Sequence, residues 1–270
     1  MLDGRLLVDA HVHVPVLGSL AQAWIDWARD FGPEGILEEL WDTDGVPRPD
    51  RLDALFEEQG VDHALLFCEY SPKATGYQRF EDLLPLVEAN PVRFRPVANV
   101  NPHLHFPVAD EVRRQLDLGA AALKLHPVHG GFRCDDRALY PAYQVLAERG
   151  VPLIVHCGTS TFPGSMNELA DPAYLLPVVR DFPGVDEEVA VEHRQSPCTN
   201  GVSTPMGPVL CDPPGAPSGS SRPGRASVKN RRLSAMCSSS SSSTRRSWLI
   251  ASTGQTGSQA PQSMHSLGLM

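Results

Sequence analysis

Two histidines separated by one residue, His11 and His13, end a short apolar run near the start of the chain. Alternate side chains of a β-strand lie on the same face, so both imidazoles would point one way from the strand's carboxyl end and could share a metal ion. A catalytic zinc site takes three protein ligands and keeps one position open for water or substrate. The pair is therefore at most half of a metal site, and the alternative is two histidines in a polar loop.

Polar residues that could complete such a site follow later apolar runs. They are Glu69, Asn99, Asn101, Lys124, His126 and His156. Lys124 and His126 would share one strand face, where a cationic lysine and a neutral histidine could orient a carboxylate substrate. Their structural alternative is a lysine paired with a carboxylate and a histidine that caps a loop. A second His-x-His, at 103–105, follows an Asn-Pro turn signal instead of an apolar strand, so we expect it in a loop.

These residues need elements that bring them together. Apolar runs at 61–68, 94–101, 121–126 and 151–156 alternate with helical patterns at 49–58, 78–88, 107–118, 136–148 and 171–179. Near-continuous apolar strands separated by helices indicate parallel strands with crossover connections, in an open doubly wound sheet or a closed barrel. The polar strand ends favour a TIM-type (β/α)8 barrel, because its strand ends converge on one mouth, and the chain has neither Gly-x-Gly-x-x-Gly after the first strand nor a Walker loop.

The segment directly after the His-x-His run, residues 18–41, holds Trp24, Trp27 and Trp41. An enzyme could use a long insertion at this place to cover its substrate. Tryptophans at roughly helical spacing are more often part of ordinary packing, and packing is what we expect here.

Three stretches of the chain carry a family resemblance. They are Val-Asp-Ala-His-Val-His at 8–13, Ala-Leu-Lys-Leu-His-Pro at 122–127 with Asp136 and Tyr140-Pro141 downstream, and Val-Pro-Leu-Ile-Val-His-Cys-Gly at 151–158. In this order and spacing they resemble the amidohydrolase superfamily, and within it the amidohydrolase-related branch that includes aminocarboxymuconate semialdehyde decarboxylase and related aromatic-acid decarboxylases. The likeness covers about residues 4–185.

The resemblance implies a set of site residues. His11, His13 and His156 would bind a single divalent metal, for which zinc is expected. The family also has a ligand aspartate after the last strand, which we do not assign, and a histidine after the sixth strand for proton transfer, close to His193. The Lys-Leu-His-Pro form resembles the single-metal branch, in which this strand lines the substrate pocket. Lys124, His126 and His193 are therefore the candidate catalytic residues.

The chain changes character near residue 193. Residues 1–193 hold 15 Lys+Arg and 31 Asp+Glu, whereas residues 194–270 hold 8 and 1, so the net charges are −16 and +7. The later part is rich in Pro, Ser and Gly, includes six consecutive serines and lacks periodicity, which predicts disorder. We expect a partial barrel of about five to six units over 1–193 and a tail over 194–270. The tail could be a natural basic extension; we favour translation out of frame from between about 186 and 200, because an unfinished barrel leaves an open edge.

Two classes of function fit this sequence. One is a metal-dependent hydrolase or decarboxylase acting on a small carboxylated or carbonyl substrate; the alternative is a catalytically inert truncated barrel that at most binds metal. Nucleic-acid binding is disfavoured, because eight positive charges over 77 residues with Trp248 as the only aromatic make no dense basic surface. We see no signal peptide, no apolar run of about 20 residues and no Cys-x-x-Cys pair, so we expect a cytoplasmic protein with reduced thiols, and leave a homo-oligomer open.

Overall fold

The strands form one parallel sheet that winds in a single direction. The structure is a computed structural model that describes residues 6–29, 35–186 and 189–192. Its main sheet has the order β1 (Val8–Val12), β2 (His63–Phe67), β5 (Phe94–Asn99), β6 (Leu123–Leu125), β7 (Leu153–His156) and β8 (Val189–Glu192). Neighbouring strands follow in chain order, without the reversal of a doubly wound sheet. This is the winding of a TIM-type barrel, so the predicted partial barrel of five to six units is confirmed.

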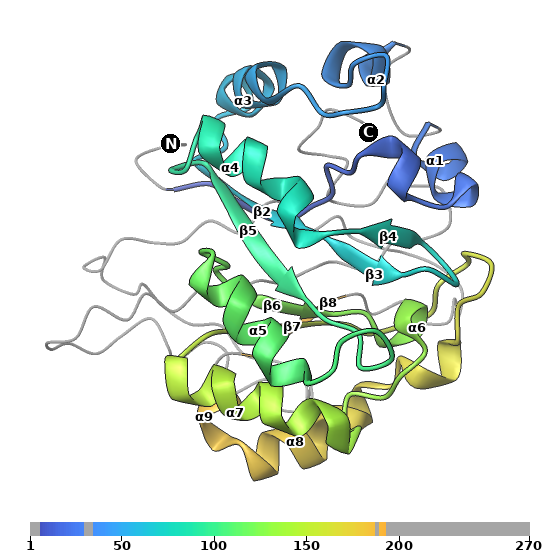
Figure 1. Cartoon of the computed structure of the whole chain (residues 1–270), viewed down its shortest axis with the longest axis vertical. Coiled ribbons are helices and arrows are strands. Elements are labelled where there is room, and N and C mark those ends of the chain that lie inside the picture. The colour runs from blue at the N-terminus through green and yellow to red at the C-terminus, as the bar shows by residue number, and fades with distance from the viewer. Residues whose placement is uncertain (1–5, 30–34, 187–188, 193–270) are drawn as a thin grey trace, which may run out of the picture.

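Helices occupy the connections between these strands (Figure 1). They are α1 (Gln22–Arg29), α2 (Ile36–Leu40) and α3 (Pro49–Glu58) after β1, α4 (Leu84–Ala89) before β5, α5 (Val108–Asp117) before β6, α6 (Pro127–Gly130) and α7 (Tyr140–Arg149) before β7, and α8 (Leu176–Asp181) and α9 (Pro183–Asp186) before β8. Short 3₁₀ helices cover Leu17–Ser19, Phe80–Leu83, Arg137–Leu139, Asn167–Leu169 and Pro172–Leu175. None of the helices in the described ranges is both long and apolar enough to cross a membrane.

Local sequence explains where these helices begin and end. Pro49 occupies the first turn of α3, where a missing N–H costs nothing, and the carboxylate of Asp50 faces the positive end of the helix dipole. Helix α7 ends at Gly150, whose φ of 60° gives the left-handed turn that closes many helices. Both helices therefore lie close to where the sequence pattern predicts them.

The helix predicted at 78–88 begins later than expected. Gln78 ends β4 (Gly76–Gln78), which pairs antiparallel with β3 (Glu69–Ser71), and helical backbone starts only at Phe80. Gly76 has a φ of 132°, and a Cβ there would lie 2.5 Å from the Cα of Leu20, so only glycine allows this approach. The sequence pattern does not predict this hairpin, because strands of three residues are too short to show a hydrophobic alternation.

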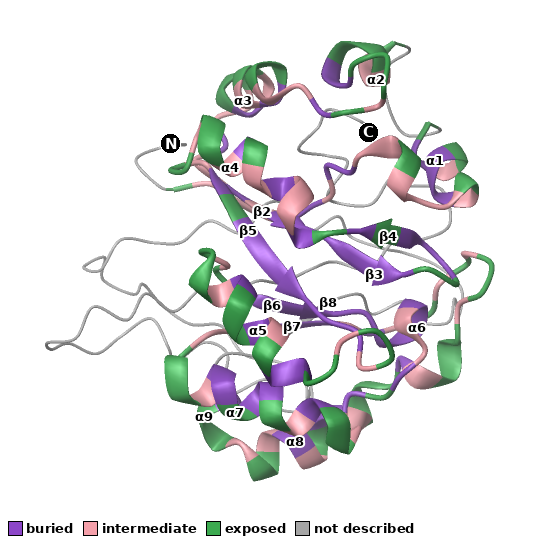
Figure 2. Cartoon of the chain, in the orientation of Figure 1, coloured by how far each residue is buried: buried purple, intermediate pink, exposed green. Residues whose placement is uncertain are grey.

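The sheet has two chemically different faces. On the outer face, Leu123, Leu125, Leu153 and Val155 are fully buried against helices that include α5 and α7 (Figure 2). On the inner face, a separate cluster is formed by Phe67, Val97, Ala122 and Ile154. Side chains alternate along a strand, so the residues in register with the inner cluster point into the barrel.

Candidate active site

The barrel interior receives the predicted polar residues by this alternation. Lys124 lies between two outward leucines, and His156 follows Val155, so both side chains point inward. His11 and His13 flank Val12, which is fully buried in the outer core. The inner face of the barrel therefore becomes polar toward the carboxyl ends of its strands.

His11 and His13 lie together at the end of β1. Their Nε2 atoms are 3.0 Å apart and their ring centroids 5.0 Å apart. Two nitrogens on one tetrahedral zinc would be about 3.3 Å apart, because each Zn–N bond is about 2.0–2.1 Å. The side chain of Asp9 accepts a hydrogen bond from the backbone N–H of His11 at 3.1 Å, and burial raises the pKa of the Asp9 carboxyl to about 8. The pair therefore has nearly the spacing of two ligands of one ion.

His126 connects the two sides of the mouth. Its ring centroid lies 6.3 Å from that of His13 and 6.2 Å from that of His156. Its Nδ1 is 2.9 Å from Nδ2 of Asn99 and 3.4 Å from Oε2 of Glu69. Burial, followed by the positive charge of Lys124, holds the pKa of His126 well below its ordinary value. His126 is therefore a neutral imidazole whose orientation is fixed by two buried polar neighbours.

Lys124 and Glu69 are the buried ionisable groups beside His126. The Lys124 side chain is fully buried, with Nζ 4.7 Å from the ring centroid of Phe67. Burial lowers the pKa of Lys124 well below its ordinary value, and the negative charge of Glu69 acts in the opposite direction. Burial also raises the pKa of Glu69 to about 7. Near neutral pH, Glu69 is therefore easily converted between its charged and neutral forms, whereas for Lys124 burial disfavours the charged form.

His129 extends the histidine cluster. It lies on α6, and its ring centroid is 5.0 Å from that of His156 and 5.7 Å from that of His126. Its Nε2 is 3.0 Å from Oγ of Ser160, in the connection after β7. No role is predicted for His129 from the sequence, although its position three residues after a strand-end histidine is a usable signal. Glu69 and Asn99 were recognised only as polar strand ends.

The predicted ligands are only partly assembled. His11 and His13 lie together, whereas His156 lies beside His126 and His129. Within residues 6–29, 35–186 and 189–192, no three His, Cys, Asp or Glu side chains are arranged so that they could hold a metal ion. The predicted catalytic residue His193 and the tail at 194–270 lie outside the described residues.

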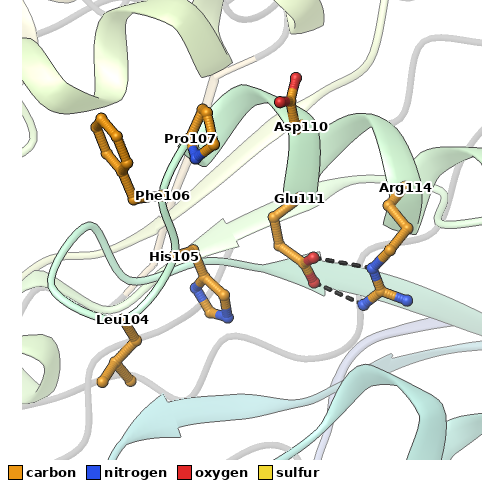
Figure 3. Close-up of a pocket in the computed structure, with 7 residues that line it drawn as sticks. All are labelled: Leu104, His105, Phe106, Pro107, Asp110, Glu111 and Arg114. Carbon is orange, nitrogen blue, oxygen red and sulfur yellow. Dashed lines mark hydrogen bonds and ion pairs between the residues drawn. The ribbon is translucent and has the colours of Figure 1, made fainter.

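The second His-x-His is in a loop, as predicted. His105 lines a pocket of about 340 Å³ beside the start of α5, and Nε2 of His103 donates to the carbonyl of Gly131 at 2.9 Å. Figure 3 shows His105 beside the ion pair of Glu111 with Arg114, whose closest atoms are 2.6 Å apart. This pocket shares no lining residue with the histidine cluster, so the pair at 103–105 does not contribute to the mouth.

Comparison with known families identifies the chain. A family model described as amidohydrolase matches residues 8–194. The chain belongs to the amidohydrolase family. The resemblance found in the sequence is therefore confirmed at the level of the family, and a search of curated proteins gives no match.

Solved structures similar to this amidohydrolase chain are distant. An uncharacterized TIM-barrel protein from Bordetella bronchiseptica is 19% identical, with a TM-score of 0.49, and the alignment covers 68% of this chain and 65% of that one. The 5-carboxyvanillate decarboxylase from Sphingomonas paucimobilis is 16% identical, with a TM-score of 0.44, and the alignment covers 70% of this chain and 67% of that one. The 5-carboxyvanillate decarboxylase from Novosphingobium aromaticivorans, solved with manganese, is 18% identical, with a TM-score of 0.46, and the alignment covers 70% of this chain and 64% of that one. The chain thus spans about two thirds of the length of these proteins.

The donor types at the mouth of this amidohydrolase fit a divalent transition metal. Neutral imidazole is the commonest protein ligand for such metals, and His11 and His13 already have nearly the separation of two ligands. The third imidazole, His156, is separated from the pair by His126. The residues therefore fit the metal in chemistry and, for two of three ligands, in spacing.

Proposed function

We propose that this chain carries the site of a metal-dependent hydrolase or decarboxylase, with His11, His13 and His156 as the ligands of one divalent ion. Zinc is the metal we favour, because two or three imidazoles form a typical zinc donor set. When bound, the metal would lower the pKa of a coordinated water toward about 7 or polarise a substrate carbonyl. The 3.0 Å separation of the His11 and His13 nitrogens is the observation that carries this proposal.

Lys124 and His126 would bind the anionic part of a small carboxylated substrate. A carboxylate that enters beside Lys124 would favour the charged ammonium, which burial disfavours. With the amide N–H of Asn99 donating to Nδ1, the proton of His126 belongs on Nε2, which can then donate to a substrate oxygen. Glu69, whose Oε2 lies 3.4 Å from the same ring and whose pKa burial raises to about 7, could supply a proton to the site.

The second candidate function is a catalytically inert barrel that at most binds metal. It is favoured by the incomplete ligand set among the described residues. The two candidates can be distinguished by experiment. An enzyme of this kind would bind stoichiometric metal and turn over a substrate, whereas the inert barrel would show no turnover.

The test is a metal analysis of the full chain with matched histidine variants. Purified protein is dialysed against Zn²⁺, freed of excess ion and analysed for bound zinc; His11→Ala, His13→Ala and His156→Ala should each lose it. His103→Ala is the control, because His103 is an exposed loop residue at the side of α6. The loaded protein is then assayed with carboxylated aromatics and lactones. Equal zinc in His156→Ala and in the unmodified chain would refute the ligand set, and stoichiometric zinc without turnover would favour the inert alternative.

A further inference from the structure

Six aromatic side chains form a closed ring of contacts around the mouth. We call it the aromatic collar, and its members in order are His13, Trp24, Trp27, Phe162, His129 and His126. The successive ring centroids are separated by 6.2, 5.8, 5.3, 5.9 and 5.7 Å, and His126 closes the ring to His13 at 6.3 Å. The collar therefore joins α1, the connection after β7, α6 and the residues directly after β6 and β1.

The contact of Trp27 with Phe162 is the outer part of the collar. Trp24, His126 and His129 are at most 8% exposed, whereas Trp27 and Phe162 are both partly exposed. Their rings meet edge to face at an interplanar angle of 79°. This one contact joins the insertion after the first strand to the connection after β7, beside the histidines.

The Phe162 side of this contact is anchored to its surroundings. Gly164 has a φ of 85°, and a Cβ there would lie 1.9 Å from the carbonyl oxygen of Lys73, so the loop packs directly on the β3–β4 turn. The N–H of Met166 donates to the carbonyl of Val128 on α6 at 2.8 Å. Opening of the contact would therefore require movement on the side of Trp27, which lies on a helix of eight residues.

We infer that Trp27 and Phe162 form a gate that controls which molecules reach Lys124 and His126. The sequence predicts ordinary packing for the tryptophans. Trp24 is buried, and Trp27 packs against the same core while its ring also contacts Phe162 and partly faces solvent. Lys124 and His126 are buried, so a substrate that enters on the side of Trp27 and Phe162 would have to part this edge-to-face contact, and the resulting gap would limit substrate size. The gate rests on the proposed function only in taking the histidine cluster as the reaction centre.

The gate is tested without metal or substrate by the access of a small reagent to the buried histidines. Diethyl pyrocarbonate acylates neutral imidazole nitrogens, and mass spectrometry resolves the rate at each peptide. Trp27→Ala and Phe162→Ala should each speed acylation of His126 and His129 by about 2- to 10-fold, as expected for loss of one aromatic pair. Trp27→Phe, which keeps a ring, should give a smaller increase. The double variant should add little, because both substitutions break the same contact.

The matched control is Phe182→Ala. Phe182 meets Tyr140 in a similar edge-to-face contact, at 5.2 Å and 76°, but in the helical layer away from the mouth. Its acylation rates should equal those of the unmodified chain. Unchanged rates in Trp27→Ala and Phe162→Ala, or an equal increase in Phe182→Ala, would overturn the gate. Since the acylation rates are measured without zinc, loss of the metal proposal would leave this result intact, and the reverse also holds.

Discussion

Glu69 gives the sharpest test of the electrostatics of the barrel interior. Its side chain is only 5% exposed, and its Oε2 lies 3.4 Å from the neutral imidazole of His126. Burial disfavours the carboxylate and raises the pKa of Glu69 from an ordinary 4.5 to about 7. Glu69→Gln keeps the shape of the protonated acid and removes the ionisation, so it isolates this one titration.

The direction of the pH effect follows from proton linkage. Below about pH 4.5 Glu69 is protonated in both the folded and the unfolded state; between about 4.5 and 7 only the folded state keeps the proton. The free energy of unfolding therefore falls as the pH rises through this window, and then levels off above pH 7. The raised pKa corresponds to a loss of about 3 kcal/mol at most, since one pKa unit is worth about 1.4 kcal/mol.

The assay is urea unfolding followed by tryptophan fluorescence at several pH values from 4.5 to 8.5. Glu69→Gln should match the unmodified chain near pH 4.5 and be more stable at pH 8, by up to about 3 kcal/mol. Glu148→Gln, at an exposed position on α7, is the control and should follow the unmodified chain throughout. Parallel pH curves for Glu69→Gln and the unmodified chain would refute the assignment of a buried, protonated Glu69.

Two further substitutions test the barrel interior and the loop after β7 that carries Phe162 and Gly164. Lys124→Met replaces a fully buried amine by an apolar side chain of similar length, so urea unfolding at pH 5, where Glu69 is protonated, should show a gain of about 1–3 kcal/mol; a loss would mean that the amine stabilises the fold. Gly164→Ala should cost more than about 1 kcal/mol in the same measurement, because of its positive φ and the approach to Lys73, whereas Gly18→Ala, with open space and no positive φ, should change little.

The sequence predicted the winding of the sheet because hydrophobic periodicity and strand-end chemistry act locally. The run at 151–156 is apolar on both faces, which is the pattern of a strand covered on both sides, and it forms β7. The positions at which elements begin and end were predicted less accurately. The strand predicted at 121–126 has strand geometry only over Leu123–Leu125, because the register of β5 and β7 sets where its ladder stops. Short elements such as β3 and β4 depend on a single close approach, at Gly76, which periodicity cannot reveal.

The histidines at the strand ends could be predicted from the sequence, whereas His129 and the grouping of the site could not. Alternation along one strand placed His11 beside His13, and this local relation is what the structure has. The curvature of the sheet decides which imidazoles come together across the barrel. This curvature cannot be derived from the spacing of residues in the sequence. His129 approaches His156 only because α6 turns back immediately after β6. Contacts of this kind arise from the path of a loop, so they appear only with coordinates.

The separation of His156 from His11 and His13 has a geometric origin in the sheet itself. His156 is paired in register with Glu192 of β8, and β8 and β1 are the two end strands of the described sheet. In a closed barrel the number and tilt of the strands fix the curvature, and so they fix the distance between inward side chains on distant strands. In a sheet that is not closed, small changes of twist at each strand pair can move the same side chains apart. The distance from His156 to β1 therefore depends on the curvature of all the strands between them. If His11, His13 and His156 bind one ion as we propose, its affinity would depend on this curvature, and substitutions that flatten the sheet at β5 or β6 should weaken zinc binding.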